Sequence, residues 1–456
     1  MPSIDRALRY EEKEAIGLLS IGTFLEYFDM MLYVHMAVLL NELFFPKTAP
    51  HTAALLSAFA FCSSYVFRPV GALLFGYIGD HIGRKPTIII TTTMMALSCF
   101  IMSILPTYEQ IGVAASVIMI GCRILQSLAA TGELIGAEIY ITETLPTPKS
   151  YIVVSWLTET CLLGGASALL IATIVLKLQA NWRIIFLVGS IVAIIGTTAR
   201  TRLKETIEFS DLKRRMKKAI AEANVEGWGK VAQSLKKANP VWKEKVDWRT
   251  SLAYFCIYAG GPLCFYISYI YGGELLKSQF NYVASDVMWH NFKLQMLGFV
   301  SGVSLILLCK YINPLWLIKY RAIIFLLLSP FISSIMVFTN NINIFCVIQA
   351  LSVIFCLGAL PAAPILFRHF PILKRFTYSS LLYSLSRAIM YLITSVGLVY
   401  LINYFNKFGV LLLSIPITIG FLWGVVHFEQ LEATEINMLA PYSFKRKLNR
   451  NVKVTI

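Results

Sequence analysis

Long apolar segments separated by short polar ones run along almost the whole chain. A bilayer core of about 30 Å requires roughly 20 apolar residues per helix, and segments of this kind recur twelve times. The predicted spans are residues 15–40, 52–79, 87–105, 111–140, 151–176, 184–199, 250–276, 287–309, 322–339, 342–366, 378–404 and 409–427. The eighth span is the least apolar, because Lys293 lies inside it. The pattern predicts an all-α polytopic membrane protein with about twelve transmembrane helices.

A long charged segment separates the first six predicted spans from the last six. We expect a short N-terminal segment (1–14), a six-helix half (15–199), a central loop (200–249), a second six-helix half (250–428) and a basic tail (429–456). Two six-helix halves are the plan of a large group of secondary transporters.

Composition and charge support a membrane protein. The chain is 57% hydrophobic and only 14% charged, with a mean hydropathy of +0.68, whereas about a quarter of the residues of an ordinary soluble domain are charged. Of the 40 Lys and Arg residues, 31 lie in the two terminal segments, the central loop and the alternate loops on the same side. Positive charge favours the cytoplasmic side, so both termini and the central loop are expected there. Topology and attraction to anionic lipid explain the net charge of +15, and a nucleic-acid partner is not needed.

A glycine-rich charged turn follows the second predicted span. It reads GYIGDHIGRKP, residues 76–86. Its glycines permit a tight turn and a close backbone approach. The segment resembles the G-x-L-A-D-R-x-G-R-K signature of major facilitator transporters, with His81 where Arg is usual. The resemblance implies the major facilitator fold and a gating loop whose Asp faces the positive N-terminal end of a helix in the other half. The expected gating residues are Gly76, Asp80, Gly83, Arg84 and Lys85.

Further motifs narrow the resemblance to the metabolite:proton symporters, the group of proline/betaine, ketoglutarate, citrate and shikimate carriers. GTFLEYFDMMLY (22–33) is similar to their G-N-x-L-E-W-Y-D-F-x-x-Y pattern, and RILQSLAATGELIGA (123–137) to their R-L-L-Q-G-x-x-x-G-G-E-x-G-G-A pattern. NWRIIFLVG (181–189) and RTRLKETIEF (200–209) resemble two more of their segments. The resemblance covers roughly residues 20–210.

Charged side chains inside the predicted spans are the candidate chemistry, because intramembrane charges are costly and need a partner or a water-filled path. On the first span, two carboxylates three residues apart share a helix side with a tyrosine. One of them is therefore expected to carry a proton easily. On the fourth span, an arginine, a glutamine and a glutamate share a face. The candidates for substrate and proton handling are Glu26, Asp29, Tyr33, Arg68, Arg123, Gln126 and Glu133. A structural role as intramembrane ion pairs is the alternative for these charges. Glu159 and Glu274 also lie in apolar surroundings, but their spacing indicates no partner.

The second half departs from the family pattern. CKYINPLWLIKYRA (309–322) has charge but no Gly-Asp turn where many such transporters carry a second latch. In PAAPILFRHFPILKRFTYSSLLYSLSRA (361–388), Arg368 stands where Glu is usual, and Arg387 adds a charge to the eleventh span. These changes leave open an altered substrate or an altered coupling.

The combined pattern predicts a secondary active transporter in a bacterial inner membrane, with proton-coupled symport of proline, betaine or a carboxylate by alternating access. The partners are then a small substrate, protons and the lipid bilayer, and no oligomer is required. The proton gradient is the energy source, and no cofactor or metal is expected. A carrier-like sensor or scaffold that has lost transport is the alternative. An enzyme is disfavoured, because the chain has no H-E-x-x-H, G-x-S-x-G or P-loop motif.

Overall fold

The computed structural model describes residues 10–44, 65–178, 181, 183–201, 210, 214, 245–405 and 408–451. The rest of the expected central loop, and residues 52–64 of the second predicted span, lie outside these ranges. Within the described helices, the side chains of Asp29, Tyr33 and Glu133 are also outside the described part.

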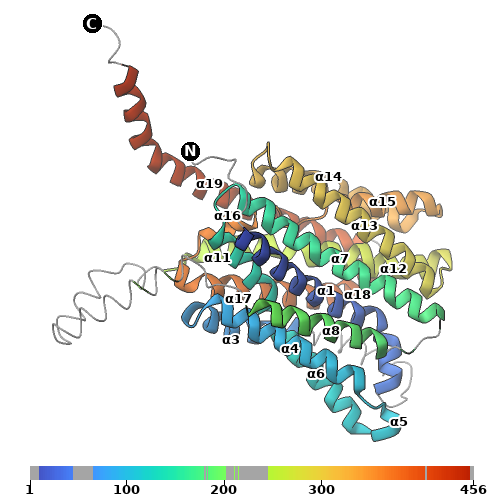
Figure 1. Ribbon diagram of the computed structural model, residues 1–456. Helices are drawn as coiled ribbons and strands as arrows, with labels where there is room; N and C mark the ends of the chain where they lie inside the picture. The colour runs from blue at the N-terminus through green and yellow to red at the C-terminus, as the bar shows by residue number, and fades with distance from the viewer. Residues whose placement is uncertain are drawn as a thin grey trace.

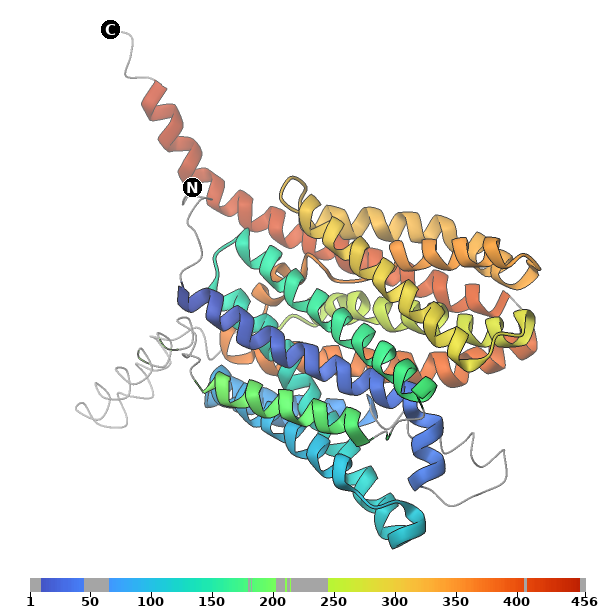
Figure 2. The same cartoon turned by 45° about the vertical axis from the view of Figure 1, so that its right-hand side comes forward.

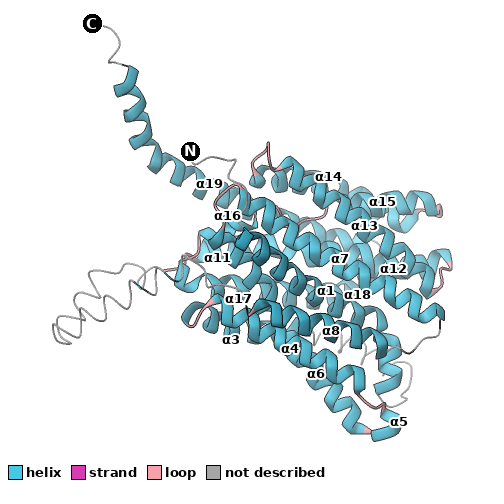
Figure 3. Ribbon diagram, in the orientation of Figure 1, coloured by secondary structure: helices cyan, strands magenta, loops and turns pink. Residues whose placement is uncertain are grey.

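Helices make up the regular structure throughout the described ranges (Figures 1 and 3). In the first half they are α1 (Tyr10–Phe44), α3 (Arg68–His81), α4 (Arg84–Ile104), α5 (Tyr108–Ile111), α6 (Val113–Thr144), α7 (Lys149–Leu178) and α8 (Arg183–Arg200). In the second half they are α11 (Trp248–Phe265), the π-helix η2 (Tyr266–Tyr271), α12 (Gly272–Phe280), α13 (Ala284–Leu308), α14 (Pro314–Phe338), α15 (Ile342–Ile354), α16 (Ala363–Arg368), α17 (Ile372–Leu392), the π-helix η3 (Ile393–Gly397), α18 (Leu398–Phe405) and α19 (Gly409–Asn451).

Over its described part, every predicted span except the tenth is helical apart from single residues, and seven helical segments in the described ranges are long and apolar enough to cross a membrane. Two boundaries were wrong in ways that matter for function. The ninth span begins at Pro314, eight residues before the predicted start at residue 322, so Arg321 lies inside α14. The tenth predicted span, 342–366, is two helices separated by residues 355–362.

The break between α15 and α16 has a local cause. Gly358 and Pro361 lie within the interval, and proline lacks a backbone N–H and clashes with the preceding helical turn. Arg321 donates from Nη2 to the carbonyl of Ile354, the last residue of α15, at 2.9 Å. A cation at a helix C-terminus satisfies a carbonyl that has lost its helical partner.

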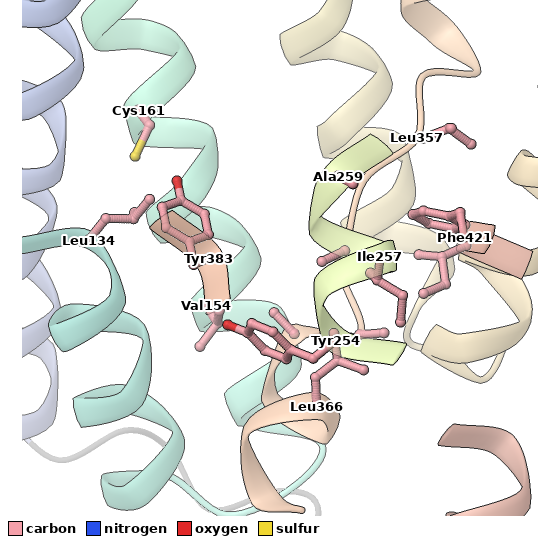
Figure 4. Close-up of a cluster of buried hydrophobic side chains, with 14 of the residues drawn as sticks. Leu134, Val154, Cys161, Tyr254, Ile257, Ala259, Leu357, Leu366, Tyr383 and Phe421 are labelled. Atoms are coloured by element: carbon pink, nitrogen blue, oxygen red, sulfur yellow. The ribbon is translucent and has the colours of Figure 1, made fainter. Parts of the chain in front are cut away.

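The two halves pack against each other along two pairs of helices. The helix α3 lies beside α17, and α7 lies beside α13. Between the halves, one apolar core combines residues from both: in Figure 4, Leu134, Val154 and Cys161 of the first half lie near Tyr254 and Tyr383 of the second.

The last helix continues well beyond the predicted span 409–427. The helix α19 runs for 43 residues and leaves the bundle at the same end at which α1 begins (Figures 1 and 2). Two contacts connect it to its own half at this end, an ion pair between Lys319 and Glu429 at 2.7 Å and a hydrogen bond between His369 and Glu432 at 3.1 Å. The expected basic tail is therefore helical as far as Asn451.

Close approach of α1 and α7 depends on Gly164, because a Cβ there would overlap the backbone carbonyl of Phe24. We expect Gly164→Ala to lower the free energy of unfolding by about 1–3 kcal/mol, since overpacking forces backbone shifts. Thermal unfolding of the purified protein in detergent measures this effect.

The matched control is Gly121→Ala on α6, where a Cβ would meet nothing within 4 Å. Replacing a glycine inside a helix by alanine gains up to about 1 kcal/mol of helix propensity, so this variant should unfold at the same or a higher temperature. Equal destabilisation by both substitutions would contradict the packing explanation.

Candidate functional site

The turn between α3 and α4 brings the expected gating residues against the second half. Gly83, the residue before α4, has a φ of 151°, a conformation that favours glycine. A Cβ on Gly76 would press on the Cα of Thr377, and one on Gly79 would press on the ring of Phe376. The small residues of α3 therefore allow it to touch α17.

Asp80 binds the N-terminal part of α17. One carboxylate oxygen accepts the backbone N–H of Phe376 at 3.1 Å. The other accepts the backbone N–H and the hydroxyl of Thr377 at 2.8 and 2.7 Å. A negative charge is favourable at the positive end of a helix dipole. This arrangement is the one that the family resemblance implies.

Arg84 extends the same contact into a buried charge network. Its side chain is fully buried and pairs with Asp80 at 3.1 Å and with Glu143 at 3.0 Å. Glu143 also accepts from Arg375 of the second half at 3.1 Å. Arg84 donates in addition to the carbonyl of Ile372, at the first residue of α17. We call Asp80, Arg84, Glu143 and Arg375 the latch network.

Two further residues of this turn are Lys85, an expected gating residue, and His81, which stands where Arg is usual in the family pattern. His81 is exposed and stacks on the ring of Tyr77, with ring centroids 4.1 Å apart. Lys85 is half-buried at the start of α4.

Four of the seven expected substrate and proton residues form two pairs in the structure. Glu26 and Arg68 form a buried ion pair at 3.7 Å between α1 and α3. Arg123 donates to Gln126 on the same helix at 2.7 Å. Asp29, Tyr33 and Glu133 belong to α1 and α6, but their side chains lie outside the described part. The roles of all seven residues stay predictions.

A cavity of about 260 Å³ lies between the two halves. It is lined by α1, α6 and α7 on one side and by α11, η2, α13, α14, α15, α17 and the interval 355–362 on the other. None of Glu26, Arg68, Arg123 and Gln126 lines it, although Tyr27, next to Glu26, does. Arg387 lines the cavity, whereas Arg368 does not.

The charged cavity residues differ in sign between the halves. Glu138 and Glu159 come from the first half, and Arg321 and Arg387 come from the second. Each glutamate is attracted by the positive charge of one arginine. Arg387 acts on Glu138, and Arg321 acts on Glu159. The cavity therefore has two charged poles.

The pole at Arg387 is rich in tyrosine. The Arg387 guanidinium carbon lies 4.4 Å from the centre of the Tyr383 ring, and Nη2 donates to the Tyr27 hydroxyl at 3.5 Å. Opposite, Glu138 accepts from Thr158 at 2.9 Å. One oxygen of Glu138 and the Nε of Arg387 have no hydrogen-bond partner among the described groups. This pole can receive a ligand that carries both an acceptor and a positive charge.

Three important residues escaped the sequence analysis. Glu138 and Glu143 lie in α6 near its end, and the rule that makes intramembrane charges informative applied to Glu138 as well as to Glu133. Arg321 was placed in a loop by the error in the start of α14.

The known proteins that are similar to this chain in sequence or in structure are transporters. Residues 16–257 match the family model described as sugar (and other) transporter. A proline/betaine transporter of Escherichia coli (strain K12) is 33% identical over 204 residues, which are 43% of this chain and 41% of that protein. A glycine betaine/proline/ectoine/pipecolic acid transporter of Dickeya dadantii (strain 3937) is 30% identical over the same shares of each chain. An inner membrane metabolite transport protein of Escherichia coli (strain K12) is 32% identical over 197 residues, 41% of this chain and 45% of that protein.

These matches span less than half the length of the curated relatives. Solved structures cover nearly the whole chain. A proton:xylose symporter aligns with a TM-score of 0.72 over 92% of this chain and 95% of that chain, at 12% identity. A partially occluded, inward-open xylose transporter from E. coli aligns with a TM-score of 0.65 over 92% and 97%, also at 12% identity. This likeness shows the major facilitator fold.

The bonds of Asp80 predict how α17 behaves when the carboxylate is removed. In Asp80→Ala, the amide protons of Phe376 and Thr377 lose their acceptor. A hydrogen bond to a charged group contributes about 1.5–3 kcal/mol, so exchange of these two amides should quicken about 10- to 100-fold. Hydrogen–deuterium exchange of a peptide covering residues 372–380, read by mass spectrometry, measures this.

Asp286→Ala is the matched control, because Asp286 is an exposed carboxylate in the first turn of α13. It should leave exchange in the 372–380 peptide unchanged. Unchanged exchange in Asp80→Ala would show that Asp80 does not hold α17.

Proposed function

Because the chain belongs to the sugar (and other) transporter family of the major facilitator superfamily, we propose that it is a proton-coupled symporter of a small metabolite, working by alternating access. The substrate class that we propose is proline, betaine or a related carboxylate. The names of the proline/betaine and betaine/proline/ectoine relatives support this class for the matched stretch. Family membership also places the chain among transporters and not among enzymes.

The residues at the tyrosine-rich pole of the central cavity support the proposed substrate class. A guanidinium is a planar donor that suits a carboxylate, and Arg387 has an unsatisfied Nε at the cavity. Tyrosine faces attract a quaternary or secondary ammonium group, and Tyr27, Tyr258, Tyr383 and Tyr391 line the same space. Glu138 supplies the negative charge opposite. A small zwitterion satisfies both signs at once.

Alternating access requires that the contacts between the halves break on one side at a time. The latch network joins the halves at the end of the bundle where α1 begins, and the cavity lies between the same two halves. Breaking the network would expose Arg84 and its partners to water, which compensates their charge. The network is thus suited to alternate between a closed, dry state and an open, hydrated one.

Orientation in the membrane follows from charge. Lys and Arg are in excess in the segments on one side of the predicted membrane topology. We therefore propose that the latch end and both termini face the cytoplasm. A bacterial inner membrane agrees with the name of the inner membrane metabolite relative.

Uptake into proteoliposomes tests the proposal. Labelled proline, betaine and a panel of dicarboxylates are offered with and without an inward proton gradient. Gradient-dependent accumulation of one of them is the expected result. If folded protein takes up none of them, the alternative of a carrier-like sensor or scaffold gains weight, although the charged cavity disfavours it.

Arg387 should determine substrate affinity. In Arg387→Lys the charge stays, but the planar donor and the ring contact with Tyr383 are lost. We expect the apparent affinity for the substrate to fall about 10- to 100-fold, which corresponds to the 1.5–3 kcal/mol of a charge-assisted hydrogen bond. Concentration-dependent uptake gives the value of KM.

A matched control exists in Arg249→Lys. Arg249 also lies over an aromatic ring, that of Trp248 at 5.7 Å, but it does not line the cavity. Its substitution should leave KM unchanged. An unchanged KM in Arg387→Lys would remove Arg387 from the binding site.

A further inference from the structure

The second charged pole of the cavity is centred on Glu159. This residue lies in the N-terminal half of α7 and is only 4% exposed. One of its carboxylate oxygens has no hydrogen-bond partner among the described groups, yet the side chain lines the cavity. A buried carboxylate without full hydrogen bonding is costly when charged.

Arg321 faces Glu159 from the other half. It lies on α14 and donates from Nη2 to the carbonyl of Ile354 and, at 3.6 Å, to Sγ of Cys356. Its Nε has no hydrogen-bond partner among the described groups, and its charge acts on Glu159 across the cavity. The guanidinium is therefore fixed to the break between α15 and α16 and attracts the carboxylate without a direct bond.

A glycine on α13 makes room for the carboxylate. A Cβ on Gly302 would overlap the carboxylate of Glu159. The carboxylate therefore packs directly against the backbone of α13 in the second half. Glu159 thus contacts one element of the other half and is attracted by another.

We propose that Glu159 is the proton-binding residue of the transport cycle, and that its attraction to Arg321 links protonation to the separation of the halves. The carboxylate takes up a proton from water on one side of the membrane and later releases it to water on the other side. Apart from this O–H bond, no covalent bond forms or breaks. The charged carboxylate holds α7 to the second half. The neutral acid loses this attraction, and its burial costs less.

The groups that face Glu159 are consistent with one titrating carboxylate. Arg321 is the cation that acts on it from α14. From the second half, the thiol of Cys356 and the phenol of Tyr269 line the same cavity. Glu138 and Arg387 form the other pole, so the substrate and the proton would occupy separate parts of one cavity.

The inference rests on the proposed function, and Glu159→Gln separates the two. In proteoliposomes, this variant should keep exchange of labelled for unlabelled substrate and lose accumulation driven by the proton gradient. Glu159→Asp keeps a titratable group and should restore part of the accumulation. Glu274→Gln is the matched control, because Glu274 is an exposed carboxylate on α12, and it should accumulate substrate like the unaltered protein.

Two outcomes overturn the assignment. Full gradient-driven accumulation in Glu159→Gln would show that another group carries the proton. Loss of exchange together with accumulation would place Glu159 in substrate binding or in folding.

A second measurement does not need the substrate. Infrared difference spectra between low and high pH should show the carbonyl band of a protonated, buried carboxyl group in the unaltered protein and in Glu274→Gln, and should lose it in Glu159→Gln. If no tested substrate is taken up but this band behaves as expected, the substrate proposal fails and the proton site stands. A band unaffected by Glu159→Gln overturns the site itself.

Discussion

Arg84 connects more of this molecule than any other charge at the latch end. Its guanidinium meets Asp80, Glu143 and the start of α17, and it is fully buried. A buried guanidinium is tolerated only when several acceptors surround it. Every one of these acceptors lies at a helix end, so the positions of α3, α4, α6 and α17 depend on one another. The solvation requirement of this guanidinium thus adds to the close packing of α3 on α17 at the latch end.

A second constraint operates in the cavity, where the halves carry opposite signs. Carboxylates come from α6 and α7, and guanidinium groups come from α14 and α17. Opposite charges across a narrow space attract strongly at low dielectric and weakly when water enters. A ligand that carries both signs, or a proton that removes one, changes this attraction directly. In the proposed function, this cavity is where substrate and proton act on the relative position of the halves.

The sequence predicted the fold well because bilayer thickness requires long apolar segments, and twelve of them can be recognised in the chain. Hydropathy failed at the tenth span, since the non-helical interval 355–362 is as apolar as a helix. The turn motif indicated Asp80 and Arg84, but Glu143, the partner of Arg84, and Arg375, which donates to Glu143, lie far away in the sequence and carry no local sign of pairing. In the cavity, Glu138 and Arg321 were missed because helix faces and helix ends, which decide what a charge meets, are the least certain part of a sequence-based prediction.

The second half has no counterpart of the turn that carries Asp80 and Arg84. Between α13 and α14 the chain has no Gly-Asp turn, and Lys319, in the first turns of α14, binds Glu429 of α19 within the same half. Lys319 therefore does not hold the halves together in the way that Asp80 and Arg84 do. On this side the halves meet through α7 and α13, where Glu159 rests on Gly302. One interface thus contains a buried charge network, and the other contains a single carboxylate placed against backbone. In the proposed cycle, protonation of that carboxylate loosens the α7–α13 interface while the latch network stays closed.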